Sequence, residues 1–445
     1  MKRTALIPHK ELISLCWSIC FLFLLSLAFS CGSPQKNETS IEPHGGSEND
    51  EAGIEKKGTG LPASMDTHSV HGSDSRTADK SPENAAPVPV IIIPGIAGSE
   101  LAERGGGGGL EILWPPAGSS SDEDESITDL GGLLSLVDSS LIRLERLSLS
   151  PALQKGAIVP LRCSSASPSP SGRVGTGDIY KPLYEALETA KGKGDVYFFG
   201  YDWRQDNNLT AAGLDRYIDD VLSRSGAVKV DLVAHSMGGL VASSYLTRPG
   251  AKQKIRKIVM AGSPLAGSAE AFRSLDPNRH GQSIVGNPSL FRGDLGHLNP
   301  SPDSGPGQIS QALELEMRRL ISGYPSIYEL LTTQDFSQLS ELGLPQEAVS
   351  PEAAVKAISL ARVYNERIAV RLPEIWRNVD VCFLTGVGHQ TLDSAGGYTD
   401  GDGTVSLKSA IGGGVFADRS IKIQMDHVGL IRSTEAIRQI IDYLN

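Results

Sequence analysis

The stretch Val230-Asp-Leu-Val-Ala-His-Ser-Met-Gly-Gly239 decides how this chain folds, and it continues directly into Leu240-Val-Ala-Ser-Ser-Tyr245. Its first residues form a short apolar run typical of a buried strand, and its last residues are typical of a helix start. Ser236 therefore lies on a tight turn between a strand and a helix, flanked by the small residues Ala234 and Gly238. A serine on such a turn is a candidate nucleophile, because the strained backbone exposes its hydroxyl at the end of the strand.

Buried strands alternating with helices are predicted on both sides of this stretch. Further short apolar runs predict strands at residues 88–93, 195–199, 255–260, 379–384 and 421–425. Helical patterns lie at residues 179–191, 210–224, 238–247 and 434–444. This alternation indicates a mostly parallel sheet with helices on both faces, and together with the serine turn it predicts an α/β-hydrolase fold over residues 87–445.

Two long insertions interrupt the alternation and are expected to form a lid and a cap over the site. The lid insertion spans about residues 103–175 and carries a glycine run, an acidic run and a Ser/Pro-rich segment. Partial disorder of this insertion is the alternative that its composition allows. The cap insertion spans about residues 268–377, with helices predicted at 309–321 and 351–371.

The N-terminal residues 1–30 resemble a bacterial lipoprotein signal segment. Positive charge precedes a long apolar run, and Cys31 follows at the position that would receive the lipid. The leucine usual three places before the cysteine is displaced by one place, to Leu27. The expected location is therefore the bacterial cell envelope, with a lipid anchor at Cys31. Secretion after ordinary signal cleavage and an uncleaved transmembrane anchor are the alternatives. Residues 31–86 contain few large apolar side chains and are expected to be a disordered tether.

Composition excludes several classes of protein. The chain has 445 residues and a formal net charge of -11, so no basic face is expected for a nucleic acid partner. No cysteine or histidine spacing indicates a metal site, and the glycine loop after the first strand lacks the lysine of a phosphate loop, so neither metal nor cofactor is expected. Only Cys163 and Cys382 lie in the predicted domain, which allows at most one disulfide there.

A serine nucleophile needs a base, and the base needs an acid to orient it. In this fold the three residues follow in the order Ser, Asp, His. His427 comes directly after the last predicted strand, at the edge of the sheet where function collects. For the acid, both Asp400 and Asp402 in Tyr398-Thr-Asp-Gly-Asp-Gly-Thr-Val405 qualify, whereas Asp426 is expected to point away from His427.

The negative charge that develops during acyl transfer needs backbone N–H donors. The amide of Met237, directly after the serine, is one expected donor of this oxyanion hole. The other is expected from the loop Pro94-Gly-Ile-Ala-Gly-Ser99, with Ile96 as the best candidate. A simple glycine turn without such a role is the alternative for this loop.

These segments together resemble the lecithin:cholesterol acyltransferase family, which includes lysosomal phospholipase A2 and phospholipid:diacylglycerol acyltransferases. The resemblance rests on Ile93–Leu101 with the later Leu113–Pro115, on Tyr201-Asp-Trp-Arg204, on Ala234–Gly238 and on Asp400–Val405. It implies that the catalytic aspartate is Asp402, that the histidine is His427, and that Ile96 and Met237 supply the oxyanion donors. It also implies a structural role for Asp202 and Arg204, below the site.

The resemblance implies an O-acyltransferase or phospholipase that acts on lipid acyl esters through a serine acyl-enzyme. Its expected partners are a lipid or phospholipid substrate and, through the N-terminal anchor, a membrane surface; its oligomeric state is left open. A lipase or carboxylesterase acting on neutral or short-chain esters is the first alternative. A surface lipoprotein that uses the fold only for binding is the alternative from another class of function.

Overall fold

The computed structural model describes residues 87–115, 143, 145–149, 156–275, 319–342, 351–394 and 396–445. The expected signal segment, the expected lipidation site Cys31 and the expected tether at 31–86 therefore lie outside the described residues. Within the described residues, no helix has both the length and the apolar character needed to cross a membrane.

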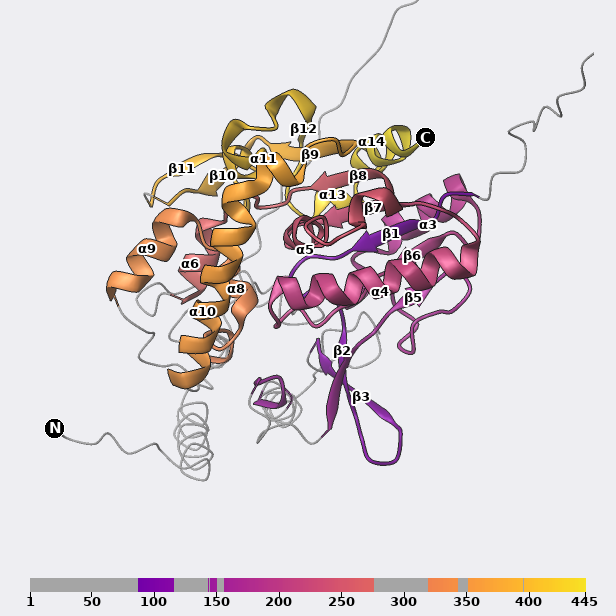
Figure 1. Ribbon diagram of the computed structural model, residues 1–445, viewed down its shortest axis with the longest axis horizontal. Coiled ribbons are helices and arrows are strands. Elements are labelled where there is room, and N and C mark those ends of the chain that lie inside the picture. The colour runs from indigo at the N-terminus through magenta and orange to yellow at the C-terminus, as the bar shows by residue number, and fades with distance from the viewer. Residues whose placement is uncertain are drawn as a thin grey trace, which may run out of the picture. The chain divides into compact units, whose positions relative to one another are not determined.

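A seven-stranded sheet forms the centre of the described fold (Figure 1). The strand order is β12 (Ser420–Gln424), β9 (Val381–Val387), β8 (Ile255–Ala261), β7 (Val230–His235), β1 (Val90–Ile93), β6 (Val196–Phe198) and β5 (Cys163–Ser164). All neighbours from β12 to β6 are parallel, and β5 pairs antiparallel with β6 at the edge. Because β7 pairs with β1 and with β8, the turn at Ser236 follows a strand in the interior of the sheet.

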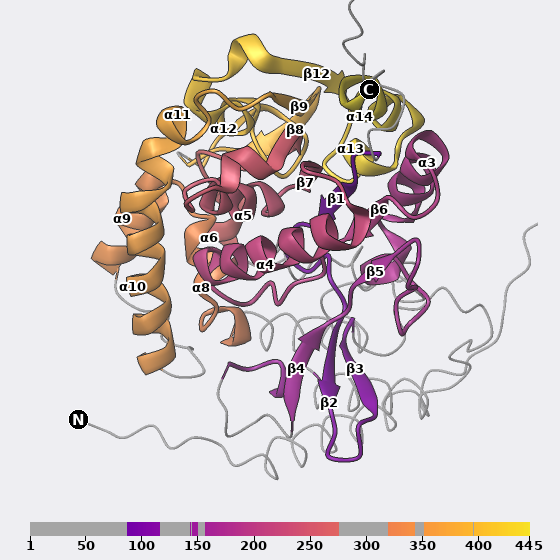
Figure 2. The same cartoon turned by 45° about the vertical axis from the view of Figure 1, so that its right-hand side comes forward.

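Helices cover both faces of this sheet (Figures 1 and 2). In β1, Ile91 and Ile93 belong to the core shared with α4 (Asn207–Ser225) and α5 (Gly238–Tyr245). The alternate residues Val90 and Ile92 belong to the core shared with α3 (Lys181–Lys191), α13 (Gly429–Arg432) and α14 (Thr434–Leu444). Since successive side chains of a strand point to opposite faces, a continuous apolar run such as that of β1 serves both cores. The predicted fold class, a mostly parallel sheet between two layers of helices, is confirmed.

The first long helix after the sheet's β6 begins earlier than the sequence pattern predicts. Helix α4 starts at Asn207 instead of residue 210. The cause is the preceding residue Asp206, whose Oδ1 accepts the amides of Asn208 at 2.6 Å and Leu209 at 3.0 Å. A side-chain cap of this kind satisfies N–H groups that have no partner inside the helix, so it extends the helix toward its N-terminus.

The stretch predicted as a lid contains strands that the sequence analysis did not predict. Strands β2 (Leu101–Arg104), β3 (Leu110–Trp114) and β4 (Ala157–Pro160) form an antiparallel sheet in which β2 is central (Figure 2). The glycine run Gly105–Gly109 is the hairpin connection between β2 and β3. Its composition resembles a linker, because glycine carries no side-chain pattern from which a strand pair can be inferred. Most of residues 116–155 lie outside the described residues, so the lid itself stays a prediction.

The insertion between β8 and β9 is helical wherever it is described. It contains α6 (Ala269–Leu275), α8 (Pro325–Glu329), α9 (Thr333–Leu342), α10 (Pro351–Arg367), the 3-10 turn Ala369–Arg371 and α11 (Leu372–Ile375). The predicted helix at 351–371 therefore ends at Arg367 and is followed by a separate turn. The predicted helix at 309–321 lies mostly outside the described residues. After β9, the chain forms a hairpin of β10 (His389–Leu392) and β11 (Tyr398–Gly401), which the sequence analysis also did not predict.

Candidate active site

Ser236 lies at the sharp turn between β7 and α5, with a backbone φ of 53°. A positive φ is strained for a residue with a side chain and is found mainly where function requires it. The turn is held by the Ser236 amide, which donates to the Ala261 carbonyl at 2.9 Å. It also needs glycine at position 238, because a Cβ there would lie 2.4 Å from the Ile93 carbonyl oxygen. The structure thus places Ser236 on the strand–turn–helix arrangement that the sequence predicted.

His427 and Asp402 meet at the same edge of the sheet. His427 Nδ1 lies 2.8 Å from Asp402 Oδ2, and the His427 amide donates to the Asp402 carbonyl at 2.9 Å. The other carboxylate oxygen, Oδ1, accepts the amides of Thr404 at 2.9 Å and Val405 at 2.7 Å. Asp402 is 2% exposed. A buried carboxylate held in this way fixes the ring orientation of the histidine and leaves its Nε2 available.

The two other aspartates have separate roles. Asp400 lies exposed on β11, where its carboxylate accepts the amide of Gly388 at 2.6 Å. Asp426 Oδ1 accepts the amide of Gly429, the first residue of α13, at 2.6 Å. Of the three, only Asp402 has a hydrogen bond to the ring of His427 among the described residues, so the geometry favours Asp402 over Asp400 as the acid.

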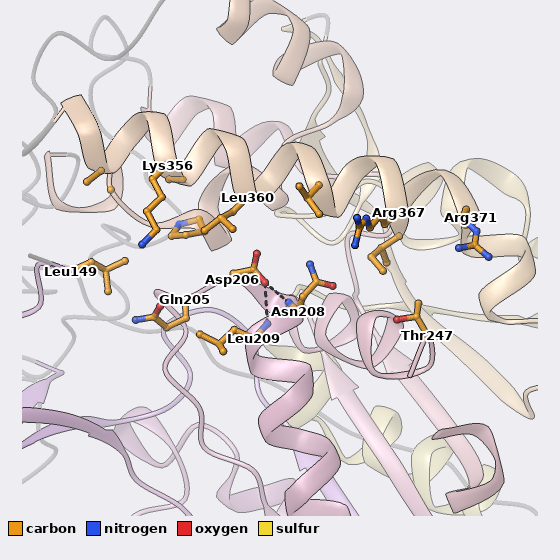
Figure 3. Close-up of a pocket in the computed structure, with 16 residues that line it drawn as sticks. Leu149, Gln205, Asp206, Asn208, Leu209, Thr247, Lys356, Leu360, Arg367 and Arg371 are labelled. Carbon is orange, nitrogen blue, oxygen red and sulfur yellow. Dashed lines mark hydrogen bonds between the residues drawn. The ribbon is translucent and has the colours of Figure 1, made fainter. Parts of the chain in front are cut away.

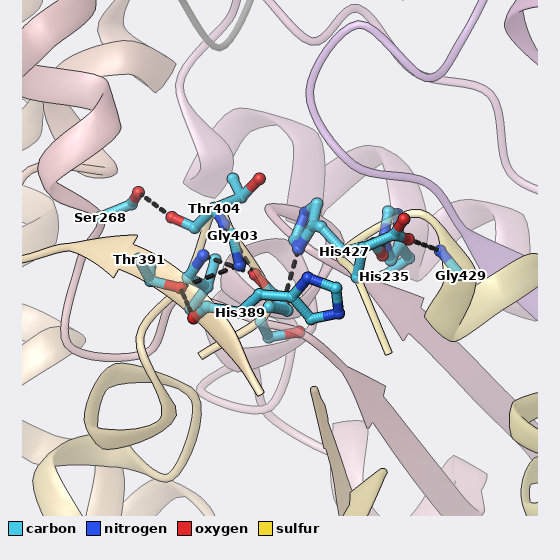
Figure 4. A network of polar contacts seen from close by, with 12 residues as sticks. His235, Ser268, His389, Thr391, Gly403, Thr404, His427 and Gly429 are labelled. Atoms are coloured by element: carbon cyan, nitrogen blue, oxygen red, sulfur yellow. Dashed lines mark hydrogen bonds and ion pairs between the residues drawn. The ribbon is translucent and has the colours of Figure 1, made fainter. Parts of the chain in front are cut away.

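His235, the residue before Ser236, lies against the ring of His427. The rings of His235 and His427 lie with their centroids 4.8 Å apart. Figure 4 shows these two rings together, with Gly403 and Thr404 of the aspartate's turn on the other side of His427. Among the described residues no hydrogen bond joins the Ser236 hydroxyl to His427. Such contacts are often long in enzymes without substrate and tighten when it binds.

Two backbone amides beside Ser236 have no hydrogen-bond partner among the described residues. They are the amides of Met237, which is fully buried, and of Ile96, in the loop after β1. The loop approaches the serine closely, since a Cβ on Gly95 would lie 2.8 Å from Ser236 Cβ. Buried N–H groups are rarely left unpaired unless a ligand or water completes them. These two amides are therefore available to an anion that forms at Ser236.

Side chains from distant parts of the chain hold the loop Pro94–Ser99, and the sequence analysis did not identify their role. Tyr201 Oη donates to the Pro94 carbonyl at 2.8 Å, Trp114 Nε1 to the Ala97 carbonyl at 2.8 Å, and Trp203 Nε1 to the Ser99 carbonyl at 3.1 Å. The two tryptophan rings also pack edge to face, with centroids 5.2 Å apart. The available signal was that Leu113–Pro115 and Tyr201–Arg204 accompany the loop in the family resemblance.

Asp202 and Arg204 form a buried ion pair next to these rings. Arg204 Nε and Nη2 each donate to one oxygen of Asp202 at 2.7 Å, and Nη1 donates to the Leu147 carbonyl at 2.7 Å. Arg204 is 1% exposed. A paired guanidinium with further backbone contacts orders the segment that carries Tyr201 and Trp203, which agrees with the structural role that the resemblance implies.

Neither cysteine of the described residues is suited to act as a nucleophile, and no metal cluster is found among these residues. Cys163 and Cys382 are both free and buried, so the single disulfide that the sequence allowed is not formed. Burial raises the pKa of the Cys163 thiol to about 12 and that of Cys382 to about 11, which keeps both protonated near neutral pH. Within the same described part of the chain, no group of three or more His, Cys, Asp or Glu side chains is arranged to hold a metal ion.

A cavity of about 930 Å³ lies between α10 and the start of α4. Lys356, Leu360 and Arg367 project from α10 toward Asp206 and Leu209 (Figure 3). Neither Ser236 nor His427 lines this cavity. The hydrogen-bond geometry, and not the cavity volume, therefore identifies the candidate active site.

A serine at positive φ between a buried strand and a helix, in a mostly parallel sheet with helices on both faces, defines the α/β-hydrolase class. Comparisons with known proteins narrow this class. Residues 179–283 match the family model described as Lecithin:cholesterol acyltransferase. The chain is 24% identical over 309 residues to Phospholipase A(1) LCAT3 of Arabidopsis thaliana, covering 57% of this chain and 66% of that protein. It is 29% identical over 170 residues to Lecithin-cholesterol acyltransferase-like 4 of the same plant, covering 36% of this chain and 30% of that protein.

These matches confirm the resemblance to the lecithin:cholesterol acyltransferase family that the sequence shows. The matched region spans less than two thirds of the length of each of these two relatives. Among solved structures, the Bacillus licheniformis lipase BlEst2 in its mature form aligns with a TM-score of 0.36 and 13% identity. That alignment covers 83% of this chain and 96% of the lipase.

Proposed function

We propose that this protein is a serine-dependent acyltransferase or phospholipase that acts on lipid acyl esters. The observation that carries the proposal is Ser236 at a positive φ beside the unpaired amides of Ile96 and Met237. The paired His427 and Asp402 at the same edge of the sheet supply the base that a serine nucleophile requires. This combination is suited to a carbonyl carbon that passes through a tetrahedral, negatively charged intermediate.

The proposed reaction has two halves. In the first, Ser236 Oγ forms a bond to the ester carbonyl carbon while its proton passes to His427 Nε2. The carbonyl oxygen becomes an oxyanion that accepts hydrogen bonds from the Ile96 and Met237 amides. The bond to the leaving alcohol then breaks, and that alcohol takes the proton from His427. In the second half, water or an acceptor alcohol gives its proton to His427 and attacks the acyl carbon. The bond from that carbon to Ser236 Oγ then breaks, and Oγ takes the proton back from His427, which releases the acid or the new ester.

The substrate class is proposed from the similarity to the lecithin:cholesterol acyltransferase family. The relatives named above are, by their names, a phospholipase A(1) and an acyltransferase-like protein. Hydrolysis and transfer differ only in the acceptor of the second half-reaction, so both are compatible with the same site. A cap that excludes water favours the alcohol over water as acceptor.

The test is turnover of a phospholipid carrying a radiolabelled acyl chain, with and without a long-chain alcohol as acceptor. We expect wild type to release the labelled chain and Ser236→Ala to release none. Ser244→Ala is the matched control, because Ser244 is also buried, lies on the adjacent α5 and has an unpartnered hydroxyl. We expect this control to retain full activity.

The outcomes separate the rival functions. Equal turnover by wild type and Ser236→Ala would contradict the mechanism. Labelled fatty acid without any labelled ester of the alcohol would assign the protein as a hydrolase. Turnover of short-chain esters but not of phospholipid would favour a carboxylesterase. A folded protein that neither turns over these esters nor reacts at Ser236 with a fluorophosphonate probe would favour a binding lipoprotein.

We infer further that the protein is held at a bacterial envelope membrane by a lipid on Cys31. The support is the signal-like sequence before Cys31 and the polar composition of residues 31–86, which would separate the enzyme from the membrane. In cells fed a radiolabelled fatty acid, we expect label on the wild-type chain and none on Cys31→Ser. Label on both variants, or on neither, would contradict lipidation at this cysteine.

A further inference from the structure

We propose that His235 and Tyr180 are positioning residues of this site, which join the loop that carries the Ile96 amide to the loop that carries His427. The inference rests on the proposed function of Ser236. It concerns a pair of buried polar side chains that the proposed acyl transfer does not itself use. Neither residue was predicted as a functional residue from the sequence.

A continuous chain of hydrogen bonds carries the proposal. Gly95 N lies 2.8 Å from Tyr180 Oη, and Tyr180 Oη lies 2.8 Å from His235 Nδ1. On the other side of the ring, His235 Nε2 lies 3.1 Å from the carbonyl oxygen of His427. Tyr180 is 1% exposed and His235 is 4% exposed. The chain therefore runs through the protein interior, from one side of Ser236 to the other.

The direction of every hydrogen bond in this chain follows from its two ends. The His427 carbonyl can only accept, so His235 Nε2 carries a proton and donates it. In a neutral imidazole the other nitrogen is then an acceptor, so Tyr180 donates its hydroxyl proton to His235 Nδ1. The same hydroxyl oxygen accepts the amide of Gly95. Each polar atom along the path has a partner, as a buried network requires.

The environment keeps His235 neutral. Burial, together with the charge of His427 when that residue is protonated, lowers the pKa of His235 from its usual 6.5 to about 3. The titratable groups that face its ring are Tyr180, at the start of α3, and His427, after β12. Burial also raises the pKa of Tyr180 above its ordinary range, so its hydroxyl stays protonated. A neutral His235 matters to the reaction, because a second positive charge 4.8 Å away would oppose protonation of His427.

Two consequences for the site follow. The Gly95 amide is occupied by Tyr180, so it is unavailable to an oxyanion, and the next amide along the loop, that of Ile96, is the free one. The His427 carbonyl is held by His235, whereas Asp402 holds the amide and the ring of His427. His235 and Tyr180 thereby set the distance between an oxyanion donor and the base without contacting the substrate.

The first test measures protons and does not depend on activity. Nitrogen NMR of the full chain labelled with ¹⁵N-histidine reports the tautomer and titration of each imidazole, and His235→Gln identifies the His235 signals. We expect the Nε2–H tautomer with no titration between pH 5 and pH 9. An Nδ1–H tautomer, or titration within that range, would overturn the proposal.

The second test compares Tyr180, directly before α3, with Tyr184 on α3. Tyr180→Phe removes the link to Gly95 and His235. Tyr184→Phe removes the hydroxyl of another buried tyrosine, one turn later, which donates to the Val196 carbonyl at 3.3 Å. We expect Tyr180→Phe to lower kcat by about tenfold with KM changed by less than about twofold, because an oxyanion donor is displaced and not removed. We expect Tyr184→Phe to keep kcat within about twofold at a similar loss of stability. Equal kcat losses in both, or none in Tyr180→Phe, would overturn the proposal.

Substitutions of His235 separate its two bonds. His235→Asn keeps an oxygen near the Nδ1 position as acceptor for Tyr180, and His235→Gln keeps a nitrogen near the Nε2 position as donor to His427. We expect each to retain more kcat than His235→Ala, and equal kcat in all three would contradict the positioning role. If Ser236→Ala turns over lipid as wild type does, the proposed function fails. The NMR test of the His235 tautomer does not depend on that outcome.

Discussion

The turn at Ser236 and the loop Pro94–Ser99 lie against each other, yet they are held in place in different ways. The turn is held mainly by its neighbours in sequence, strand β7 before it and helix α5 after it, with one hydrogen bond from the Ser236 amide to the Ala261 carbonyl of β8. The loop is held by side chains far along the chain, such as Tyr180 and Tyr201, which lie 85 and 107 residues from their partners Gly95 and Pro94. One half of the candidate site is therefore local, and the other half exists only when the whole sheet has formed.

The difference explains which substitutions can be tolerated. A local turn of this kind depends on small residues, because the crossing backbone of β1 leaves no room for a side chain at Gly238. The loop Pro94–Ser99 depends instead on particular donor side chains, because each of them reaches one carbonyl of the loop. The pair of Asp402 and His427 belongs to this second kind, because its members are 25 residues apart in the sequence.

The largest effect is expected from a substitution of Asp402, which belongs to the part of the site that distant segments hold together. We expect Asp402→Asn to lower kcat by about 10⁴-fold, because an amide no longer orients the histidine or stabilises its positive charge. Asp400→Asn is the matched control, since Asp400 is two residues away, exposed and bonded only to the Gly388 amide. Steady-state kinetics on a soluble ester measures both. Equal losses in the two variants would mean that the wrong aspartate has been assigned.

The next largest effect is expected from a substitution in the turn at Ser236. In Gly238→Ala the new Cβ would lie 2.4 Å from the Ile93 carbonyl oxygen. We expect a loss of about 1–3 kcal/mol in the free energy of unfolding, and an activity loss of about 100-fold as the serine is displaced. Gly213→Ala on α4 is the control, because its Cβ meets only Phe199 at 3.8 Å. Urea unfolding should show this control unchanged or more stable, and a stable, active Gly238→Ala would refute the local account.

A smaller effect is expected from a substitution that removes one hydrogen bond to the loop Pro94–Ser99. Tyr201→Phe removes the donor to the Pro94 carbonyl and leaves that buried oxygen unpaired. We expect about 1–3 kcal/mol lower stability and a kcat about tenfold lower. Tyr245→Phe is the control. Tyr245 lies on α5, away from the loop, and its buried hydroxyl donates to the Ala251 carbonyl. We expect this variant to lose stability without the same loss in kcat. The comparison of local and distant support weakens if the two variants have equal kcat.

The last prediction concerns the pH dependence of stability, and no change in kcat at neutral pH is part of it. Because the pKa of His235 is about 3 in the folded state and 6.5 is its usual value, the unfolded chain binds the extra proton first as pH falls. The stability that neutral His235 allows is therefore complete above pH 6.5 and is lost as the pH falls toward 3, by up to about 1.4 kcal/mol per pH unit. We expect this slope in the difference between wild type and His235→Gln in urea unfolding. Parallel curves for the two proteins would contradict it.

Much of the fold was predictable because its signals are local. The apolar runs of β1, β7 and β8 and the helical patterns of α3 and α14 are set by residues close in sequence, and the structure places all of them near their predicted bounds. The β2–β3 hairpin and the β10–β11 hairpin were missed. Their strands are short, and the glycine run Gly105–Gly109 carries no side-chain pattern.

The sequence by itself determined the alternating strands and helices, the strand–turn–helix at Ser236 and the set of residues that could assist it. It left Asp400 and Asp402 equivalent from the residues alone, and it contained no sign that Tyr180 and His235 connect two loops. The tertiary structure decided these points, because hydrogen bonds between distant segments depend on the register and packing of the assembled sheet. Local periodicity is encoded by neighbours in the chain, whereas the geometry of the site is encoded by partners that meet only after folding.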